Sequence, residues 1–179
     1  KAVANSTSLP IMVYNNPVDY KIEVTLDMFE ELLMCPNIEA VKESTRDISN
    51  ITRIKNRFGD RLHIMTGVDT LALESLLMGA NGWIAGLVCA FPKETVAIYE
   101  LQKAGRIQEA IAIYRWFLPL LELDINAKLV QNIKLAEVYT EIGTEFVRPP
   151  RLPLFGSERQ KVQNIIESAL KSRPTLPNY

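Results

Sequence analysis

The segment NIEAVKEST, residues 37–45, carries a short apolar strand straight into a charged, hydroxyl-bearing turn. Val41 is the last apolar residue of the strand, and Lys42 follows it directly. Residues 48–58 then place apolar side chains three and four positions apart, which is typical of one face of a helix, and Gly59 can end that helix. Because a strand followed by a helix makes one β–α unit, the fold class depends on how often this unit recurs.

The strand-to-helix order recurs on both sides of this segment. Further strands are expected at residues 9–13, 62–65 and 82–85. Their helices are expected to begin with Thr25 and Asp69 as N-caps and with Pro92 in the first turn. The four units occupy residues 1–104 and predict a parallel sheet that is covered on both faces, since all four strands are mostly apolar. Residues 105–179 are expected to form a helical region.

Four β–α units fit two architectures, a small open α/β sheet or half of a (β/α)8 barrel. A complete barrel takes about 250 residues, so chain length alone favours the open sheet. Both architectures bind ligands at the carboxyl ends of their strands. Those ends here carry Tyr14, Lys42, Gly67 and Ile84, which are therefore candidates for a site.

Lys42 and Tyr14 are the two strand-end residues with reactive side chains. Partial burial disfavours the charged form of a lysine, and a neutral amine can attack a carbonyl carbon. A phenol beside it can donate and accept protons as a general acid and base. Each residue also has a structural explanation, because a strand-end lysine can extend its ammonium to water and a tyrosine can pack across the sheet edge. Neither residue identifies a site by itself.

Composition and charge exclude several classes of protein. The formal net charge is -1, and the sequence has neither a basic patch for nucleic acid nor a polybasic run for a lipid surface. No run of about 18 apolar residues occurs, so no membrane span is expected. The isolated Cys35 and Cys89 favour a reduced, cytoplasmic setting, and with a single histidine, His63, no metal site is expected. His63 is expected to be a packed or hydrogen-bonded residue of the core rather than a catalytic residue.

Three short signatures each close one of the successive strands, namely YNNP at residues 14–17, VKES at 41–44 and TGVD at 66–69. As a set they resemble the dihydrodipicolinate synthase and N-acetylneuraminate lyase family of class I, Schiff-base aldolases, over about residues 9–172. The resemblance implies the C-terminal half of a (β/α)8 TIM barrel, strands 5 to 8, followed by a C-terminal helical extension. We then expect the first half of the barrel, roughly 115 to 120 residues, to lie outside this chain.

The resemblance also implies roles for the residues at the strand ends. Lys42 would form a Schiff base with a 2-keto acid such as pyruvate, and Tyr14 would relay protons. Gly67, Ile84 through its backbone, and Asn16 would bind the substrate. The family works without a cofactor, as a homotetramer acting on a small keto acid or imino acid.

Asp19 departs from the pattern of this family. Dihydrodipicolinate synthases usually have an arginine at this position, two residues after the proline of the tyrosine loop, where it grips the carboxylate of the aldehyde substrate. A carboxylate would repel that group. Residues 14–20 and 147–153 are more similar to the hydroxyproline-degradation branch, which deaminates 1-pyrroline-4-hydroxy-2-carboxylate to 2-oxoglutarate semialdehyde. The alternatives are a dihydrodipicolinate synthase, an aldolase or dehydratase of keto sugar acids, and a non-catalytic barrel homologue or inert fragment.

Overall fold

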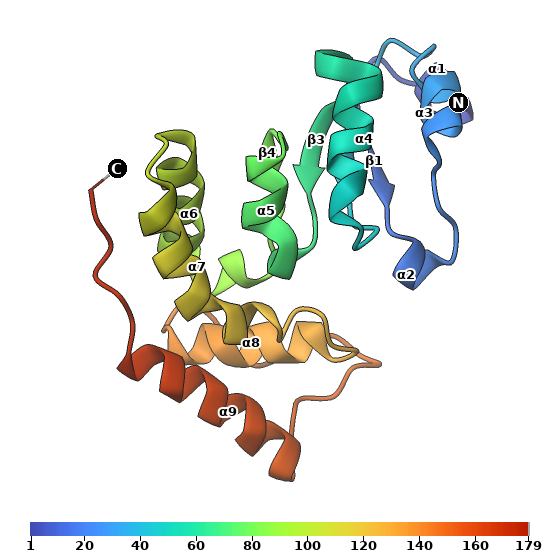
Figure 1. Cartoon of the computed structure of the whole chain (residues 1–179). Helices are drawn as coiled ribbons and strands as arrows, with labels where there is room; N and C mark the ends of the chain where they lie inside the picture. Colours follow the sequence, from blue (N-terminus) through green and yellow to red (C-terminus); the bar gives the residue numbers. More distant parts are fainter. Residues whose placement is uncertain (179) are drawn as a thin grey trace. The chain divides into compact units, whose positions relative to one another are not determined.

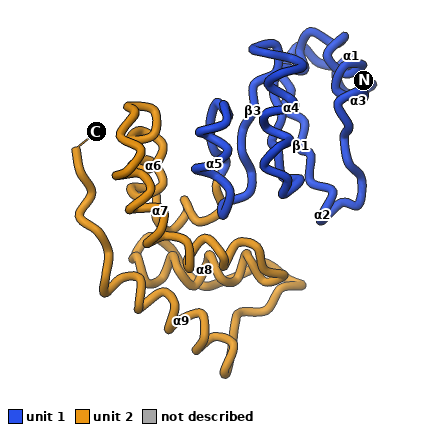
Figure 2. Tube along the Cα trace, viewed as in Figure 1, with its two compact units in different colours: residues 1–84 blue, residues 85–179 orange. Residues whose placement is uncertain are grey.

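A computed structural model of the chain describes residues 1–178, which form two compact units (Figures 1 and 2). The first unit is Lys1–Ile84 and the second begins at Ala85. The sequence suggested a division after residue 104 instead, at the end of the fourth β–α unit. That division follows the β–α repeat rather than the contacts between residues, and it stays a prediction.

The first unit contains a sheet of four parallel strands in the order β1-β2-β3-β4. The strands are β1 (Ile11–Asn15), β2 (Ile38–Glu43), β3 (His63–Thr66) and β4 (Gly82–Trp83). The helices of this unit are α1 (Ala2–Asn5), α2 (Pro17–Tyr20), α3 (Leu26–Leu32), α4 (Ile48–Phe58) and α5 (Ala72–Leu77), with short 3-10 turns at Gly59–Arg61 and Asp69–Leu71. The predicted parallel α/β sheet is thereby confirmed, with each strand paired to its neighbour along the chain.

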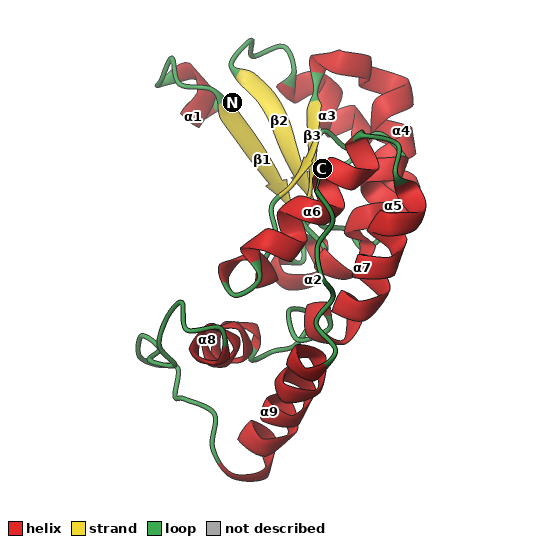
Figure 3. Cartoon of the chain, turned by 90° about the vertical axis from the view of Figure 1, so that its left-hand side faces the viewer, coloured by secondary structure: helices red, strands yellow, loops and turns green. Residues whose placement is uncertain are grey.

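One face of the sheet carries the core of the first unit. Helices α3, α4 and α5 lie on this side of the strands (Figure 3). The core cluster consists of Phe29, Val41, Ile51, Ile54, Leu62 and Ile64, each at most 2% exposed. On the opposite face, Met12, Tyr14 and His63 are exposed. Within this unit the helices cover one face of the sheet, and His63 lies on the other, because strand residues alternate between faces. The expected place of His63 in the core is therefore not found among the described residues, and the covering of the second face stays a prediction.

Two of the three predicted helix ends in the first unit, those at Thr25 and Gly59, are present in the structure, and the one at Asp69 is not. Thr25 caps α3 as predicted, since its side chain accepts a hydrogen bond from the backbone N–H of Met28. Gly59 ends α4 with a positive φ of 56°, a conformation that glycine adopts without steric cost. The predicted capping by Asp69 is wrong, because α5 begins at Ala72 without a side-chain cap. The Asp69 carboxylate instead accepts a hydrogen bond of 3.0 Å from the indole Nε1 of Trp83.

The second unit is helical. It contains a 3-10 turn at Leu87–Cys89 and the helices α6 (Pro92–Lys103), α7 (Ile107–Leu121), α8 (Leu129–Tyr139) and α9 (Gly156–Lys171). Pro92 stands at the start of α6 as predicted. The rings of Phe91, Trp116 and Phe117 pack together, with centroids 5.5 to 6.0 Å apart. Between residues 1 and 178, no helix combines the length and the apolar character that a membrane crossing requires.

Candidate active site

The register of the sheet brings the predicted residues to one face. Tyr14 on β1 pairs with Lys42 on β2, and Lys42 pairs with Met65 on β3. Gly67 is two residues beyond Met65, so it belongs to the same face of the sheet. Ile84 continues from β4, and its backbone N–H donates to the carbonyl of Thr66 over 2.9 Å. The carboxyl ends of all four strands therefore meet at one edge, as the sequence predicted.

Tyr14 and Lys42 are in direct contact across this edge. The Nζ atom of Lys42 lies 4.4 Å from the centre of the Tyr14 ring. The edge of Tyr20 packs against the same ring, with centroids 5.6 Å apart and planes at 83°. Lys42 is half-buried, while Tyr14 is 42% exposed. The amine and the phenol are thus neighbours in a position that a small molecule could reach.

Gly67 makes room for the side chain of Lys42. A Cβ atom at Gly67 would lie 2.6 Å from Cε and 2.8 Å from Cγ of Lys42, and it would also overlap the Ser44 hydroxyl. Ordinary carbon–carbon contacts are about 3.5 to 4.0 Å. Glycine is needed here for space, since Gly67 is not among the residues with a positive φ. A simple turn glycine does not explain this position.

Ser44 is a polar residue of this edge that the sequence did not single out. It is 4% exposed, and its Oγ has no hydrogen-bond partner within residues 1–178. Buried hydroxyls usually have a partner, because an unsatisfied one costs about 1–3 kcal/mol. The Oγ lies in the same small space beside Gly67 as the Lys42 stem. Its sequence signals were its membership of the VKES signature and its place two residues after Lys42, which puts both side chains on the same side of an extended backbone.

Glu43 points to the opposite, helix-covered face. Its carboxylate accepts hydrogen bonds of 2.8 Å from the backbone N–H of Thr45 and 3.3 Å from Nδ2 of Asn15. Burial raises the pKa of Glu43, and the hydrogen bonds from Thr45, Asn50 and Asn15 only partly oppose this. Glu43 therefore links β1, β2 and the start of α4, and it does not contact the Lys42 amine in the described structure.

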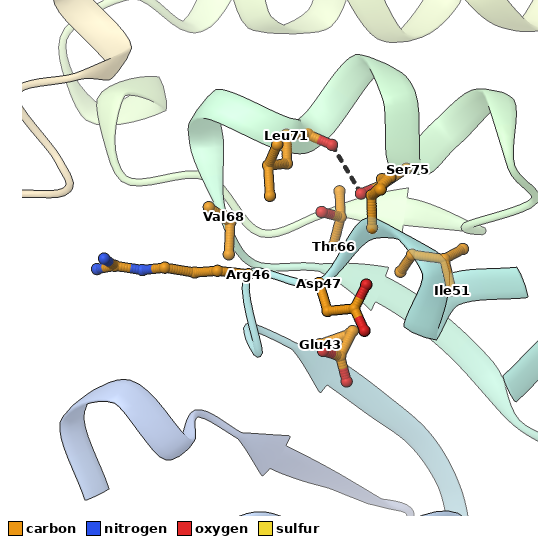
Figure 4. Close-up of a pocket in the computed structure, with 9 residues that line it drawn as sticks. Glu43, Arg46, Asp47, Ile51, Thr66, Val68, Leu71 and Ser75 are labelled. Carbon is orange, nitrogen blue, oxygen red and sulfur yellow. Dashed lines mark hydrogen bonds between the residues drawn. The ribbon is translucent and has the colours of Figure 1, made fainter. Parts of the chain in front are cut away.

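A crevice lies beside Glu43, on the helix side of the sheet (Figure 4). Its lining residues are Glu43, Arg46, Asp47, Ile48, Ile51, Thr66, Val68, Leu71 and Ser75. The volume open to the centre of a water molecule is about 10 Å³, which is room for about one water. Ser75 uses its hydroxyl within the chain, donating to the carbonyl of Leu71 over 2.7 Å. This crevice is too small for a keto acid, so the edge at Lys42 remains the candidate site.

Asn16 lies beside Tyr14 in the loop after β1. It is 7% exposed, and its Nδ2 donates to the Tyr14 hydroxyl over 3.1 Å and to the Asp19 carboxylate over 2.7 Å. The predicted contacts of Asn16, Gly67 and Ile84 with a substrate stay predictions.

Among the described residues, no group of three or more His, Cys, Asp and Glu side chains could hold a metal ion.

Comparison with known proteins identifies the family. The model of the dihydrodipicolinate synthetase family matches residues 1–169. This chain belongs to that family. The resemblance stated from the three strand-end signatures is thereby confirmed.

Individual relatives agree with this assignment. The chain is 27% identical to 4-hydroxy-tetrahydrodipicolinate synthase 2 of Halalkalibacterium halodurans, over 93% of this chain and 57% of that protein. It is 35% identical to 4-hydroxy-tetrahydrodipicolinate synthase of Shewanella piezotolerans, over 63% of this chain and 39% of that protein. The chain therefore spans less than two thirds of the length of these relatives.

Solved structures match the fold of this chain. Dihydrodipicolinate synthase from Aquifex aeolicus aligns with a TM-score of 0.87 and 25% identity, over 99% of this chain and 60% of that one. The 4-hydroxy-tetrahydrodipicolinate synthase of Methylacidiphilum fumariolicum aligns with a TM-score of 0.83 and 26% identity, over 96% of this chain and 58% of that one. The α/β fold with its parallel sheet is that of dihydrodipicolinate synthases.

Proposed function

We propose that this chain carries the nucleophile of a Schiff-base lyase acting on a 2-keto acid or a cyclic imino acid. The observation that carries the proposal is the contact between Lys42 and Tyr14, in the space that Gly67 leaves open. The neutral amine of Lys42 attacks the keto carbon and forms a C–N bond. The C=O π bond opens, and one N–H proton moves to the oxygen, which gives the carbinolamine. Tyr14 then donates a proton to the carbinolamine hydroxyl, which leaves as water, and the phenolate takes the remaining N–H proton, which leaves the neutral imine and restores Tyr14.

The proposed substrate is 1-pyrroline-4-hydroxy-2-carboxylate. Lys42 attacks the imine carbon, and the ring nitrogen leaves as a primary amine, which opens the ring. The 4-hydroxyl is then lost as water together with a proton from C5, the carbon that carries the released amino group, and this gives an enamine. The enamine becomes an imine at C5. Hydrolysis there releases ammonia, and hydrolysis of the Schiff base frees Lys42 and 2-oxoglutarate semialdehyde. One water is eliminated and two are consumed, so the net reaction takes up one water and releases ammonia.

One feature of the site supports a substrate whose far end carries no second carboxylate. Asp19 presents a carboxylate in the loop after Tyr14, and this carboxylate would repel a second carboxylate.

A dihydrodipicolinate synthase is the second candidate, and the names of the relatives favour it. An aldolase or dehydratase of keto sugar acids would use the same Lys42 and Tyr14 chemistry. The proposal further includes the placement of this chain as strands 5 to 8 of a TIM barrel, a homotetramer, and a cytoplasmic location. A non-catalytic homologue is the remaining alternative from another class.

Reductive trapping tests the proposed nucleophile. The full-length protein is incubated with pyruvate and sodium borohydride, and its intact mass is measured. We expect a covalent adduct that is lost in Lys42→Ala and kept in the control Lys21→Ala, since the Lys21 amine donates to the carbonyl of Val18 on the outside of the loop. Absence of an adduct with both pyruvate and the pyrroline substrate would contradict the Schiff-base chemistry and favour the non-catalytic homologue. If the adduct forms, release of ammonia from the pyrroline substrate separates the deaminase from the synthase and the sugar-acid enzymes.

A further inference from the structure

The loop after β1 excludes one direction in which Tyr14 could donate its phenolic proton. Both N–H bonds of the Asn16 amide are used, one toward the Tyr14 oxygen at 3.1 Å and one toward the Asp19 carboxylate at 2.7 Å. The amide oxygen of Asn16 accepts from the backbone N–H of Asp19 at 3.3 Å. The side chain of Asn16 is therefore engaged at both ends while being only 7% exposed.

The two contacts with Asp19 determine which way the amide of Asn16 faces. A carboxylate can only accept a hydrogen bond, so it requires the NH2 group of the amide. A backbone N–H can only donate, so it requires the amide oxygen. A flipped amide would place an oxygen against a carboxylate and an NH2 against an N–H. The polarity of Asn16 is thus set by Asp19 and does not depend on the substrate.

This polarity has a consequence for Tyr14. Because Asn16 presents an N–H, the Tyr14 oxygen accepts there, and the phenolic proton must be donated in another direction. The Lys42 amine lies over the ring of the same tyrosine, 4.4 Å from its centre. After Tyr14 has given its proton to the leaving oxygen of the carbinolamine, the N–H of Asn16 remains bonded to the phenolate and stabilises it.

We propose that Asn16 is a positioning residue, held by Asp19, that keeps Tyr14 as a proton donor by occupying an acceptor position of the phenolic oxygen with an N–H. The inference rests on the proposed Schiff-base function and deepens it. It gives Asp19 a role of its own, the orientation of the Asn16 amide. It also replaces the direct substrate contact expected for Asn16 by an action through Tyr14.

Exchanging the two side chains tests the proposal with little change in shape. In Asn16→Asp a carboxylate replaces the amide, so position 16 can no longer donate to Tyr14, and two carboxylates face each other. In the double variant Asn16→Asp, Asp19→Asn, an amide at position 19 again donates to a carboxylate at position 16. The hydrogen bond between the two positions is restored with reversed polarity, while Tyr14 still faces an acceptor. Comparing the single with the double variant therefore separates an effect on the stability of the protein from an effect on the direction in which Tyr14 can donate its proton.

The measurements are the thermal midpoint and the rate of reductive trapping of pyruvate in the full-length protein, over a range of pyruvate concentrations. We expect Asn16→Asp to lower both the midpoint and the maximal trapping rate, the rate by about tenfold or more, since general acid catalysis contributes roughly 10²–10⁴-fold. The double variant should regain the midpoint but not the rate. The pyruvate concentration for half-maximal trapping should stay unchanged, because Asn16 does not touch the keto acid.

Two outcomes would overturn the role of Asn16 while leaving the Schiff-base function intact. One is a wild-type trapping rate in Asn16→Asp, and the other is recovery of the rate together with stability in the double variant, which would indicate a purely structural loop contact. If the wild type itself traps no pyruvate, the Schiff-base function fails and the role of Asn16 fails with it. Trapping by the wild type, checked first, therefore distinguishes the failure of the function from the failure of this inference.

Discussion

Gly67→Ala is expected to impair Schiff-base formation while leaving the fold intact. The added Cβ would lie 2.6 Å from Cε of Lys42, about 1 Å closer than an ordinary carbon–carbon contact. The Lys42 stem must therefore move by about 1 Å, and a misplacement of that size in a reacting group can lower a rate by roughly 10²-fold. The backbone itself should accept alanine, because Gly67 is not among the residues with a positive φ.

The stability of Gly67→Ala should fall only slightly. Overpacking costs about 1–3 kcal/mol, and the overlapping atoms belong to side chains that can rotate, so we expect about 1 kcal/mol. This corresponds to a thermal midpoint lower by about 2–4 °C in a domain of this size. The assay is the rate of reductive trapping of pyruvate, measured beside thermal unfolding.

Gly82→Ala is the matched control for Gly67→Ala. Gly82 lies on the neighbouring strand, and a Cβ there would meet only the flexible end of Met65, with Cε at 2.7 Å and Sδ at 3.2 Å. Trapping by Gly82→Ala should stay close to that of the wild type. If Gly67→Ala traps pyruvate at the wild-type rate, or if both variants lose the rate equally, the steric link between Gly67 and Lys42 is wrong.

The remaining predictions concern Tyr14, Ser44 and Glu43. Tyr14→Phe should lower the trapping rate by roughly 10²–10⁴-fold with little loss of stability; equal rates would remove Tyr14 from the proton transfers. Ser44→Ala should leave the thermal midpoint unchanged or raise it, because an unsatisfied buried hydroxyl is removed; a large loss of stability would instead reveal a structural partner. Because the pKa of Glu43 is raised in the folded protein, its contribution to the free energy of unfolding is complete below the ordinary pKa of 4.5 and is lost as pH rises through the raised value. The stability of Glu43→Gln should therefore rise relative to that of the wild type as pH increases from about 4 to 7. Thermal unfolding measures this, and a difference in stability between the two proteins that stays constant across this pH range would contradict the raised pKa.

Much of the sheet edge that carries Tyr14 and Lys42 could be predicted from local sequence patterns. Short apolar runs and helices of period 3.6 are local patterns of neighbouring residues, so the four β–α units and the cap at Thr25 could be recognised without the structure. Tyr14 and Lys42 then fell at strand ends, which meet at one edge of any parallel sheet. The prediction that Asp69 caps a helix failed because it used only local sequence, a carboxylate before a helix. The hydrogen bond that Asp69 makes instead comes from Trp83, 14 positions away along the chain.

The sequence by itself determined the order of the strands and helices, the family, and the two reactive side chains at the sheet edge. The tertiary structure alone decided how those side chains are held. The closeness of Gly67 to the Lys42 stem and the burial of Ser44 depend on the register between β2 and β3. The polarity of the Asn16 amide depends on a loop that folds back on Tyr14. The physical reason is that composition and periodicity act along the chain, whereas space, burial and hydrogen-bond direction are set by atoms that only folding brings together.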